Sequence, residues 1–111
     1  MSDNPPPESF KVAIEHIPKE GRMTRFDAFG ERILLANVDG ILRAVSDTCT
    51  HEDASLSNGA LKADTVACPL HGSRFCLRTG LALDEPAELP LKVYPVQVIN
   101  DEVYLRVPET Q

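Results

Sequence analysis

Apolar and polar residues partly alternate over residues 10–17 and largely alternate over 91–99, with the period of two that is typical of a β-strand, whereas residues 33–38 form a mostly apolar run rich in β-forming residues. Turn residues separate these segments. We expect strands over residues 10–17, 22–28, 31–38, 41–46, 60–62, 65–67, 74–77, 91–99 and 102–107. No helical period of 3.6 residues runs through the segments before residue 46. The sequence therefore predicts an all-β fold with roughly eight to ten short antiparallel strands.

Turn chemistry sets the limits of several of these strands. Asp39 and Gly40 form a two-residue signal for a type I′ hairpin between two apolar strands. Asn100–Asp101 predicts another turn near the end of the chain. Pro95 has no N–H to give to a β-ladder, so we expect an edge or a bulge inside the segment 91–99.

Length and composition are ordinary for one globular domain. The chain has 111 residues, of which 42% are hydrophobic and 25% are charged. Residues 1–9 include three consecutive prolines and predict a flexible tail, followed by a single domain over residues 10–108. The net charge of −6 argues against nucleic acid and anionic membranes as partners. It fits docking on basic patches of other proteins, and it fits equally a role in solubility alone.

The sequence also carries an expectation about location. No apolar run approaches the ~18–20 residues that cross a bilayer, and the first residues lack the basic and apolar regions of a secretory signal. Three cysteines, two of them in one motif, are typical of a reducing compartment. We therefore expect a cytoplasmic monomer with no membrane partner.

Two short motifs concentrate soft metal ligands. Cys49-Thr50-His51 forms a first hook and Cys68-Pro69-Leu70-His71 a second hook, with sixteen residues between His51 and Cys68. Two thiolates and two imidazoles suit zinc, copper or an iron–sulfur centre. A zinc site of two Cys and two His uses the same side chains, but common zinc fingers place both Cys in one hook and both His in the other. Here each hook carries one of each, which is the ligand set of a centre with two metals and a His pair on one of them.

This pattern resembles the Rieske family, whose motifs read C-x-H and C-x-x-H with a gap of about this length. The resemblance implies one [2Fe–2S] cluster per chain, with Cys49 and Cys68 on one iron and His51 and His71 on the other. It also implies a Rieske-type fold with two cluster-binding loops and a Pro-rich capping loop, which residues 84–90 match in place. A structural zinc module is the alternative.

Residues around the second hook refine the resemblance. The run R-F-C-L-R-T-G at 74–80 is similar to ferredoxins of bacterial aromatic-ring dioxygenases, some of which have a Cys where Cys76 stands. We therefore expect Cys76 to be a small buried apolar residue and not a ligand. Cytochrome bc-type Rieske proteins carry an extra Cys in each loop. Ala54 and Leu70 occupy those positions here, so no bracing disulfide is expected.

Formal charge explains why imidazole ligands matter. Two ferric ions and two sulfides carry about +2, which two thiolates cancel and neutral imidazoles leave unchanged, so one added electron is easier to accept than in an all-thiolate cluster. The reduction potentials of Rieske centres accordingly span about −150 to +300 mV. Ser73 resembles a serine of high-potential members, whereas Phe75 stands where they carry a Tyr that donates to sulfur. We expect a potential in the lower half of the span.

The resemblance implies an electron carrier and not an enzyme, with no catalytic residues of its own. An oxygenase would need a further mononuclear iron site, yet no His follows residue 80, and no G-x-G-x-x-G for a flavin reductase is present. The implied role is transfer from an NAD(P)H-dependent flavoprotein reductase to a terminal aromatic-ring-hydroxylating dioxygenase. The alternative is the small Rieske-like subunit of an assimilatory nitrite reductase.

Two further expectations concern residues outside the hooks. We expect docking to use acidic residues near the hooks, namely Glu52, Asp53, Asp84 and Glu85. His16 lies far from both hooks in sequence, and we expect it to be structural or exposed.

Overall fold

The computed structural model describes residues 9–50, 53–70, 72–85 and 87–108. Ten strands and two short 3-10 helices lie in these ranges. In chain order they are β1 (Phe10–Lys11), η1 (Ile14–His16), β2 (Met23–Ala28), β3 (Glu31–Val38), β4 (Ile41–Ser46), η2 (Leu56–Asn58), β5 (Ala60–Lys62), β6 (Thr65–Ala67), β7 (Arg74–Cys76), β8 (Val93–Tyr94), β9 (Val96–Ile99) and β10 (Glu102–Leu105). Within the described ranges no helix is long and apolar enough to cross a membrane. The predicted tail, except Ser9, lies outside them.

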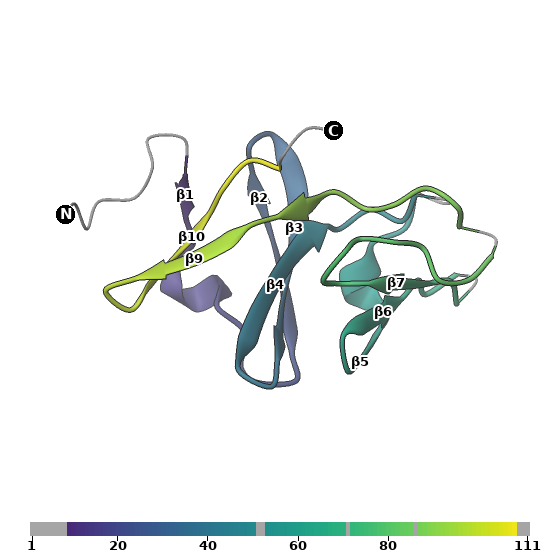
Figure 1. Cartoon of the computed structure of the whole chain (residues 1–111), viewed down its shortest axis with the longest axis horizontal. Coiled ribbons are helices and arrows are strands. Elements are labelled where there is room, and N and C mark those ends of the chain that lie inside the picture. The colour runs from purple at the N-terminus through teal and green to yellow at the C-terminus, as the bar shows by residue number, and fades with distance from the viewer. Residues whose placement is uncertain (1–8, 51–52, 71, 86, 109–111) are drawn as a thin grey trace.

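The strands form three small antiparallel sheets, which confirms the all-β prediction. Their orders are β1-β10-β9, β2-β3-β4-β8 and β5-β6-β7. Figure 1 shows the four-stranded sheet in the middle, with β5–β7 on one side and β1 with β10 on the other. The hooks belong to the β5–β7 side.

Strand β3 explains why the central sheet is covered on both faces. Its run Ile33-Leu34-Leu35-Ala36 is fully buried, and successive side chains of a strand point to opposite faces. Ile33 and Leu35 pack in one apolar cluster, and Leu34 and Ala36 pack in the other. A strand buried on both faces is a continuous apolar run and not an alternating one.

The two clusters divide the protein into a supporting half and a half that carries the hooks. The supporting cluster lies between the central sheet and β1-β10-β9 and consists of Val12, Phe26, Ala28, Ile33, Leu35, Ala44, Tyr94, Val103 and Leu105. The hook-side cluster consists of Leu34, Ala36, Val45, Cys49, Leu56, Val66, Cys68, Phe75, Leu77, Ala87 and Leu91. Both predicted cysteine ligands are members of the second cluster.

The predicted hairpin at Asp39–Gly40 is confirmed. The two residues have φ of 55° and 87°, which is the pair of positive values that a type I′ turn requires. Asn100 and Asp101, with φ of 52° and 67°, form the turn between β9 and β10.

Two predicted strands differ in the structure. The segment 10–17 is a strand only over β1, because the chain leaves the ladder after the Val12 N–H to Val103 carbonyl bond (2.8 Å) and winds into η1. There the His16 ring stacks on Phe26 with centroids 5.2 Å apart, so His16 is a structural residue as expected. The segment 91–99 divides at Pro95 into β8, which pairs with β4, and β9, which pairs with β10.

Candidate metal centre

The two predicted cysteine ligands are buried and share one apolar cluster. Cys49 follows β4 by three residues and is 4% exposed, whereas Cys68 directly follows β6 and is 3% exposed. A buried thiol in apolar surroundings is inert unless a metal or positive group stabilises its thiolate. Each of the two sulfurs therefore needs a metal or a positive group beside it if it is to act as a ligand.

The backbone holds the first hook in a closed turn. The Cys49 N–H donates to the Ala54 carbonyl (2.9 Å), and Thr48 pairs with Ser55 in an isolated antiparallel bridge. One step further out, the Leu56 N–H donates to the Asp47 carbonyl (2.6 Å). These ladder contacts fix the two ends of the hook relative to each other.

The second hook is closed in a similar way. The Cys68 N–H donates to the Ser73 carbonyl (2.8 Å), and the Gly72 N–H donates back to the Cys68 carbonyl (2.9 Å). β6 leads into this turn and β7 leaves it, and these two strands pair with each other. The turn therefore presents Cys68 at the end of a hairpin.

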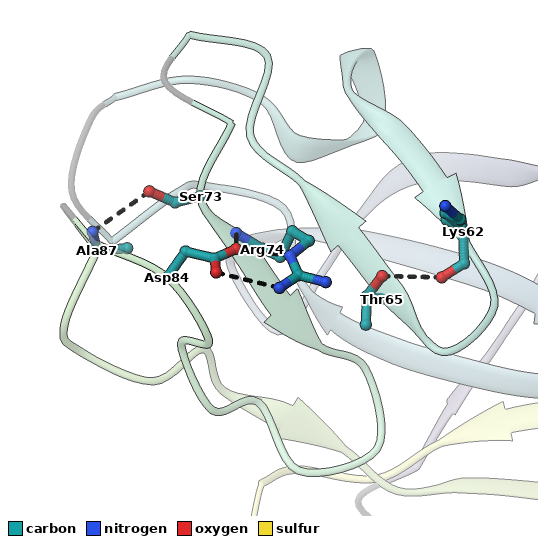
Figure 2. A network of polar contacts seen from close by, with 6 residues as sticks. All are labelled: Lys62, Thr65, Ser73, Arg74, Asp84 and Ala87. Carbon is teal, nitrogen blue, oxygen red and sulfur yellow. Dashed lines mark hydrogen bonds and ion pairs between the residues drawn. The ribbon is translucent and has the colours of Figure 1, made fainter.

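A third loop, residues 84–90, joins both hooks. The Thr50 hydroxyl donates to the Leu89 carbonyl (2.8 Å), and the Ala87 N–H donates to the Ser73 hydroxyl (3.3 Å). Figure 2 shows the second of these bonds beside the pair of Arg74 and Asp84. The loop predicted as a cap is thus bonded to the first hook through Thr50 and to the second through Ser73.

Arg74 anchors the start of the third loop. Its guanidinium donates to both carboxylate oxygens of Asp84, with Nε–Oδ2 at 2.6 Å and Nη2–Oδ1 at 3.1 Å, and its backbone N–H also donates to Oδ2 (3.1 Å). Hydrogen bonding from Arg74 lowers the pKa of Asp84 below its usual value.

The Arg74–Asp84 pair predicts a specific pH dependence of stability. A carboxyl whose pKa is depressed in the folded state adds stability above its unfolded pKa of about 4, and this contribution is lost as the pH falls through the lower folded value. We therefore expect the difference in unfolding free energy between wild type and Asp84→Asn to be constant above about pH 5 and to shrink below about pH 4. Denaturant titrations between pH 3 and pH 7 measure it.

The matched control carries Arg74→Gln. In that background the Asp84→Asn difference should lose most of its pH dependence, because the carboxylate keeps the backbone N–H donor of residue 74 but no longer has its charged donor. A pH dependence as large as that in the wild-type background would contradict the assignment of the effect to this pair.

Cys76 lies apart from the hooks, on β7. It is half-buried, where the sequence predicted a buried side chain, and hydrogen bonding from Thr79 lowers the pKa of its thiol. All three cysteines are described, and no disulfide joins any of them, as expected.

Three of the predicted residues lie outside the described ranges, namely His51, Glu52 and His71. Among the residues that are described, no group of three or more His, Cys, Asp or Glu side chains is placed to hold a metal. The described part of the donor set fits an iron–sulfur group, because it consists of two buried thiols in one apolar cluster, on two loops that are each bonded to the same third loop. Asp47 was not predicted from the sequence, where an acid two residues before Cys49 looks like an ordinary polar residue; its full burial is visible only in the structure.

The family comparison matches these hooks and the strands that support them. The family model of the Rieske [2Fe-2S] domain matches residues 9–95. The chain belongs to the Rieske [2Fe-2S] family. Its cofactor is one [2Fe-2S] cluster per chain, and the zinc alternative is therefore wrong.

Relatives of this Rieske chain are ferredoxins of aromatic dioxygenases. The 3-phenylpropionate/cinnamic acid dioxygenase ferredoxin subunit of Shigella flexneri is 46% identical over 103 residues, which cover 92% of this chain and 95% of the relative. Among solved structures, the ferredoxin of carbazole 1,9a-dioxygenase from Nocardioides aromaticivorans is 32% identical, with a TM-score of 0.82 and coverage of 91% and 98%. A chain in a complex of reduced oxygenase and oxidized ferredoxin in carbazole 1,9a-dioxygenase is 34% identical, with a TM-score of 0.85 and coverage of 94% and 98%.

These similarities confirm the resemblance drawn from the motif and from the R-F-C-L-R-T-G run. The fold is of the Rieske type, and the relatives are electron-transfer components of dioxygenase systems.

Proposed function

We propose that Cys49 and Cys68 bind one iron of the cluster and His51 and His71 the other, and that the chain carries single electrons from an NAD(P)H-dependent flavoprotein reductase to a terminal aromatic-ring-hydroxylating dioxygenase. The observation that carries the proposal is the pair of buried thiols in one apolar cluster, on two loops bonded to the same third loop. The dioxygenase ferredoxin relatives support the pathway. They favour it over the nitrite reductase alternative.

Two buried side chains near the thiols, Ser73 and Phe75, differ in whether they can donate a hydrogen bond to the proposed cluster. When bound, the cluster takes up and releases one electron. Ser73 is 1% exposed and its oxygen accepts the Ala87 N–H, which leaves its hydroxyl proton to act as a donor, in this proposal to a ligand or bridging sulfur. Phe75 is fully buried and has no group to donate. Phe75 supports a potential in the lower half of the Rieske span, whereas a hydrogen bond from Ser73 would raise the potential within that half.

Ser73 gives a direct prediction. Ser73→Ala removes the acceptor of a buried N–H, which costs about 1–3 kcal/mol of unfolding free energy. It also removes a donor beside the proposed cluster, so the midpoint potential should fall. A redox titration followed by visible absorption, together with denaturant unfolding, measures both effects.

Thr65→Val is the matched control for Ser73→Ala. The Thr65 hydroxyl donates to the Lys62 carbonyl (2.8 Å) in the β5–β6 turn of the same sheet, as Figure 2 shows. This variant loses a hydroxyl hydrogen bond at an exposed turn and should keep the wild-type potential. Equal potentials in all three proteins would contradict a role for the Ser73 proton.

The surface around the hooks is more apolar than the sequence predicts. Leu70 in the second hook is 60% exposed and Leu89 in the third loop is 66% exposed. Of the predicted acidic docking residues, Asp53 and Glu85 are exposed, whereas Asp84 is paired with Arg74. We propose that partners dock on Leu70 and Leu89, with Asp53 and Glu85 supplying charge at the rim.

Reconstitution tests the proposed function. The chain, mixed with NADH, the flavoprotein reductase and the oxygenase of an aromatic dioxygenase system, should support oxygenation of the aromatic substrate, and omission of the chain should stop it. A sirohaem nitrite reductase subunit recovered as a stable complex, with no transfer to the oxygenase, would overturn the proposal. We further propose a cytoplasmic monomer, with a single domain over residues 10–108.

A further inference from the structure

A buried acid precedes the first hook. Asp47 follows β4, is 0% exposed, and lies two residues before Cys49. Its backbone N–H donates to the Arg32 carbonyl of β3 (2.9 Å) and its carbonyl accepts the Leu56 N–H (2.6 Å). A charged side chain in such a place is costly unless its oxygens are hydrogen-bonded and its charge is balanced.

Both oxygens of the Asp47 carboxylate are satisfied by residues beyond the hook. Oδ1 accepts the Ser57 N–H (2.8 Å), and Oδ2 accepts the Ser55 hydroxyl. The side chain of Asp47 therefore bonds to residues that follow the first hook, whereas its backbone precedes the hook. The carboxylate closes the base of the loop that presents Cys49.

Ser55 extends this network to the surface. The Arg25 Nη1 donates to the Ser55 oxygen (3.0 Å), and the Ser57 hydroxyl lies 2.9 Å from the same oxygen. A hydroxyl has one proton to give and two lone pairs. Since Ser55 gives its proton to Asp47, it accepts from both Arg25 and Ser57, and the direction of every bond is fixed.

These hydrogen bonds connect a positively charged side chain at the surface to the buried carboxylate of Asp47. Arg25 lies on the edge strand β2, in the central sheet, thirty positions before Ser55. Among the described residues, its guanidinium is the cation that reaches the buried carboxylate, through a single hydroxyl. It therefore offsets part of the negative charge that Asp47 places next to the first hook.

We propose that Arg25 and Asp47 are positioning residues of the cluster site, which fix the first hook and set the charge beside Cys49 through Ser55. The inference rests on the proposed function, because it requires the cluster to be bound at Cys49. Reduction adds a negative charge to the site. The carboxylate of Asp47 disfavours that charge, and the guanidinium of Arg25 favours it.

The two side chains should therefore move the midpoint potential in opposite directions. Asp47→Asn removes a negative charge, so reduction becomes easier, by about tenfold in its equilibrium constant. Arg25→Gln keeps an N–H donor for Ser55 but removes the positive charge, so reduction becomes harder. Arg25→Lys keeps both donor and charge and should stay near wild type. In the double variant Asp47→Asn with Arg25→Gln, the two shifts should largely cancel.

Redox titration at low ionic strength measures these shifts, because salt would screen the exposed Arg25. Asp39→Asn in the β3–β4 turn and Arg106→Gln after β10 are exposed control variants that change the same charges away from the hooks. Opposite shifts for Asp47→Asn and Arg25→Gln, each larger than its control, support the inference. Shifts equal to the controls, or in the same direction, overturn it.

Loss of a hook contact alone would lower cluster retention but would not produce opposite shifts. If Asp47→Asn fails to fold, the comparison of Arg25→Gln with Arg25→Lys decides, because both substitutions are at an exposed position. A wild-type protein without the electron paramagnetic resonance signal of a reduced cluster would overturn the proposed function and this inference with it. A wild-type signal with unshifted variants would overturn the inference alone.

Discussion

Cys68→Ser is expected to yield a colourless protein that binds no iron–sulfur cluster and transfers no electrons. The Cys68 thiol is buried among the apolar side chains of the hook-side cluster, which also contains Cys49. A serine hydroxyl is a hard ligand that does not ionise at neutral pH, so it is a poor substitute for a soft thiolate on iron. The visible spectrum, iron and sulfide analysis, and electron paramagnetic resonance of the dithionite-reduced protein measure the loss.

Cys76→Ser is the matched control for this prediction. Cys76 is half-buried on β7 and is hydrogen-bonded to Thr79. A serine can keep a hydrogen bond with Thr79, and we expect wild-type colour and iron content. A full cluster in Cys68→Ser, or a lost cluster in Cys76→Ser, would contradict the assignment of the ligands.

Gly59→Ala is expected to be the most damaging single-methyl change in the hook-side half. A Cβ at Gly59 would lie 1.8 Å from the Ala67 carbonyl oxygen and 3.2 Å from that of Leu56. Both contacts are backbone atoms, so neither can rotate away. Ala67 is the last residue of β6 and directly precedes Cys68, so its displacement would move a proposed ligand. We expect a loss of about 4 kcal/mol or more of unfolding free energy, together with reduced cluster content.

Gly40→Ala separates this collision from ordinary backbone strain. Gly40 has a φ of +87° in the β3–β4 turn, and a Cβ there would meet no atom within 4 Å. Only the cost of a left-handed conformation applies, about 1–2 kcal/mol. Denaturant unfolding of both variants tests the difference, and equal losses would show that β6 yields to a side chain at position 59.

Local sequence patterns predicted most of the strands because the spacing of side chains on one strand is a local property. The hairpin at Asp39–Gly40 and the division of strands at Pro95 followed from backbone chemistry that these residues impose by themselves. The prediction of a strand over the whole segment 10–17 was wrong, because alternation shows only that a strand is possible, whereas pairing with a neighbouring strand decides where the strand ends. β10 pairs with β1 only at Phe10 and Lys11.

The sequence by itself determined the chemistry that we propose for the site, since the type and spacing of the proposed ligands are a property of the two hooks: two soft thiols and two imidazoles, with one of each in each hook. Tertiary structure decided which distant residues support them. Thr50 bonds to Leu89, and Arg25 is connected to Asp47 through Ser55. Asp84, which the sequence predicted as a docking residue, is paired with Arg74 instead. These contacts depend on how the sheets and loops pack against one another, and the pattern within a single segment does not specify which segment will face it.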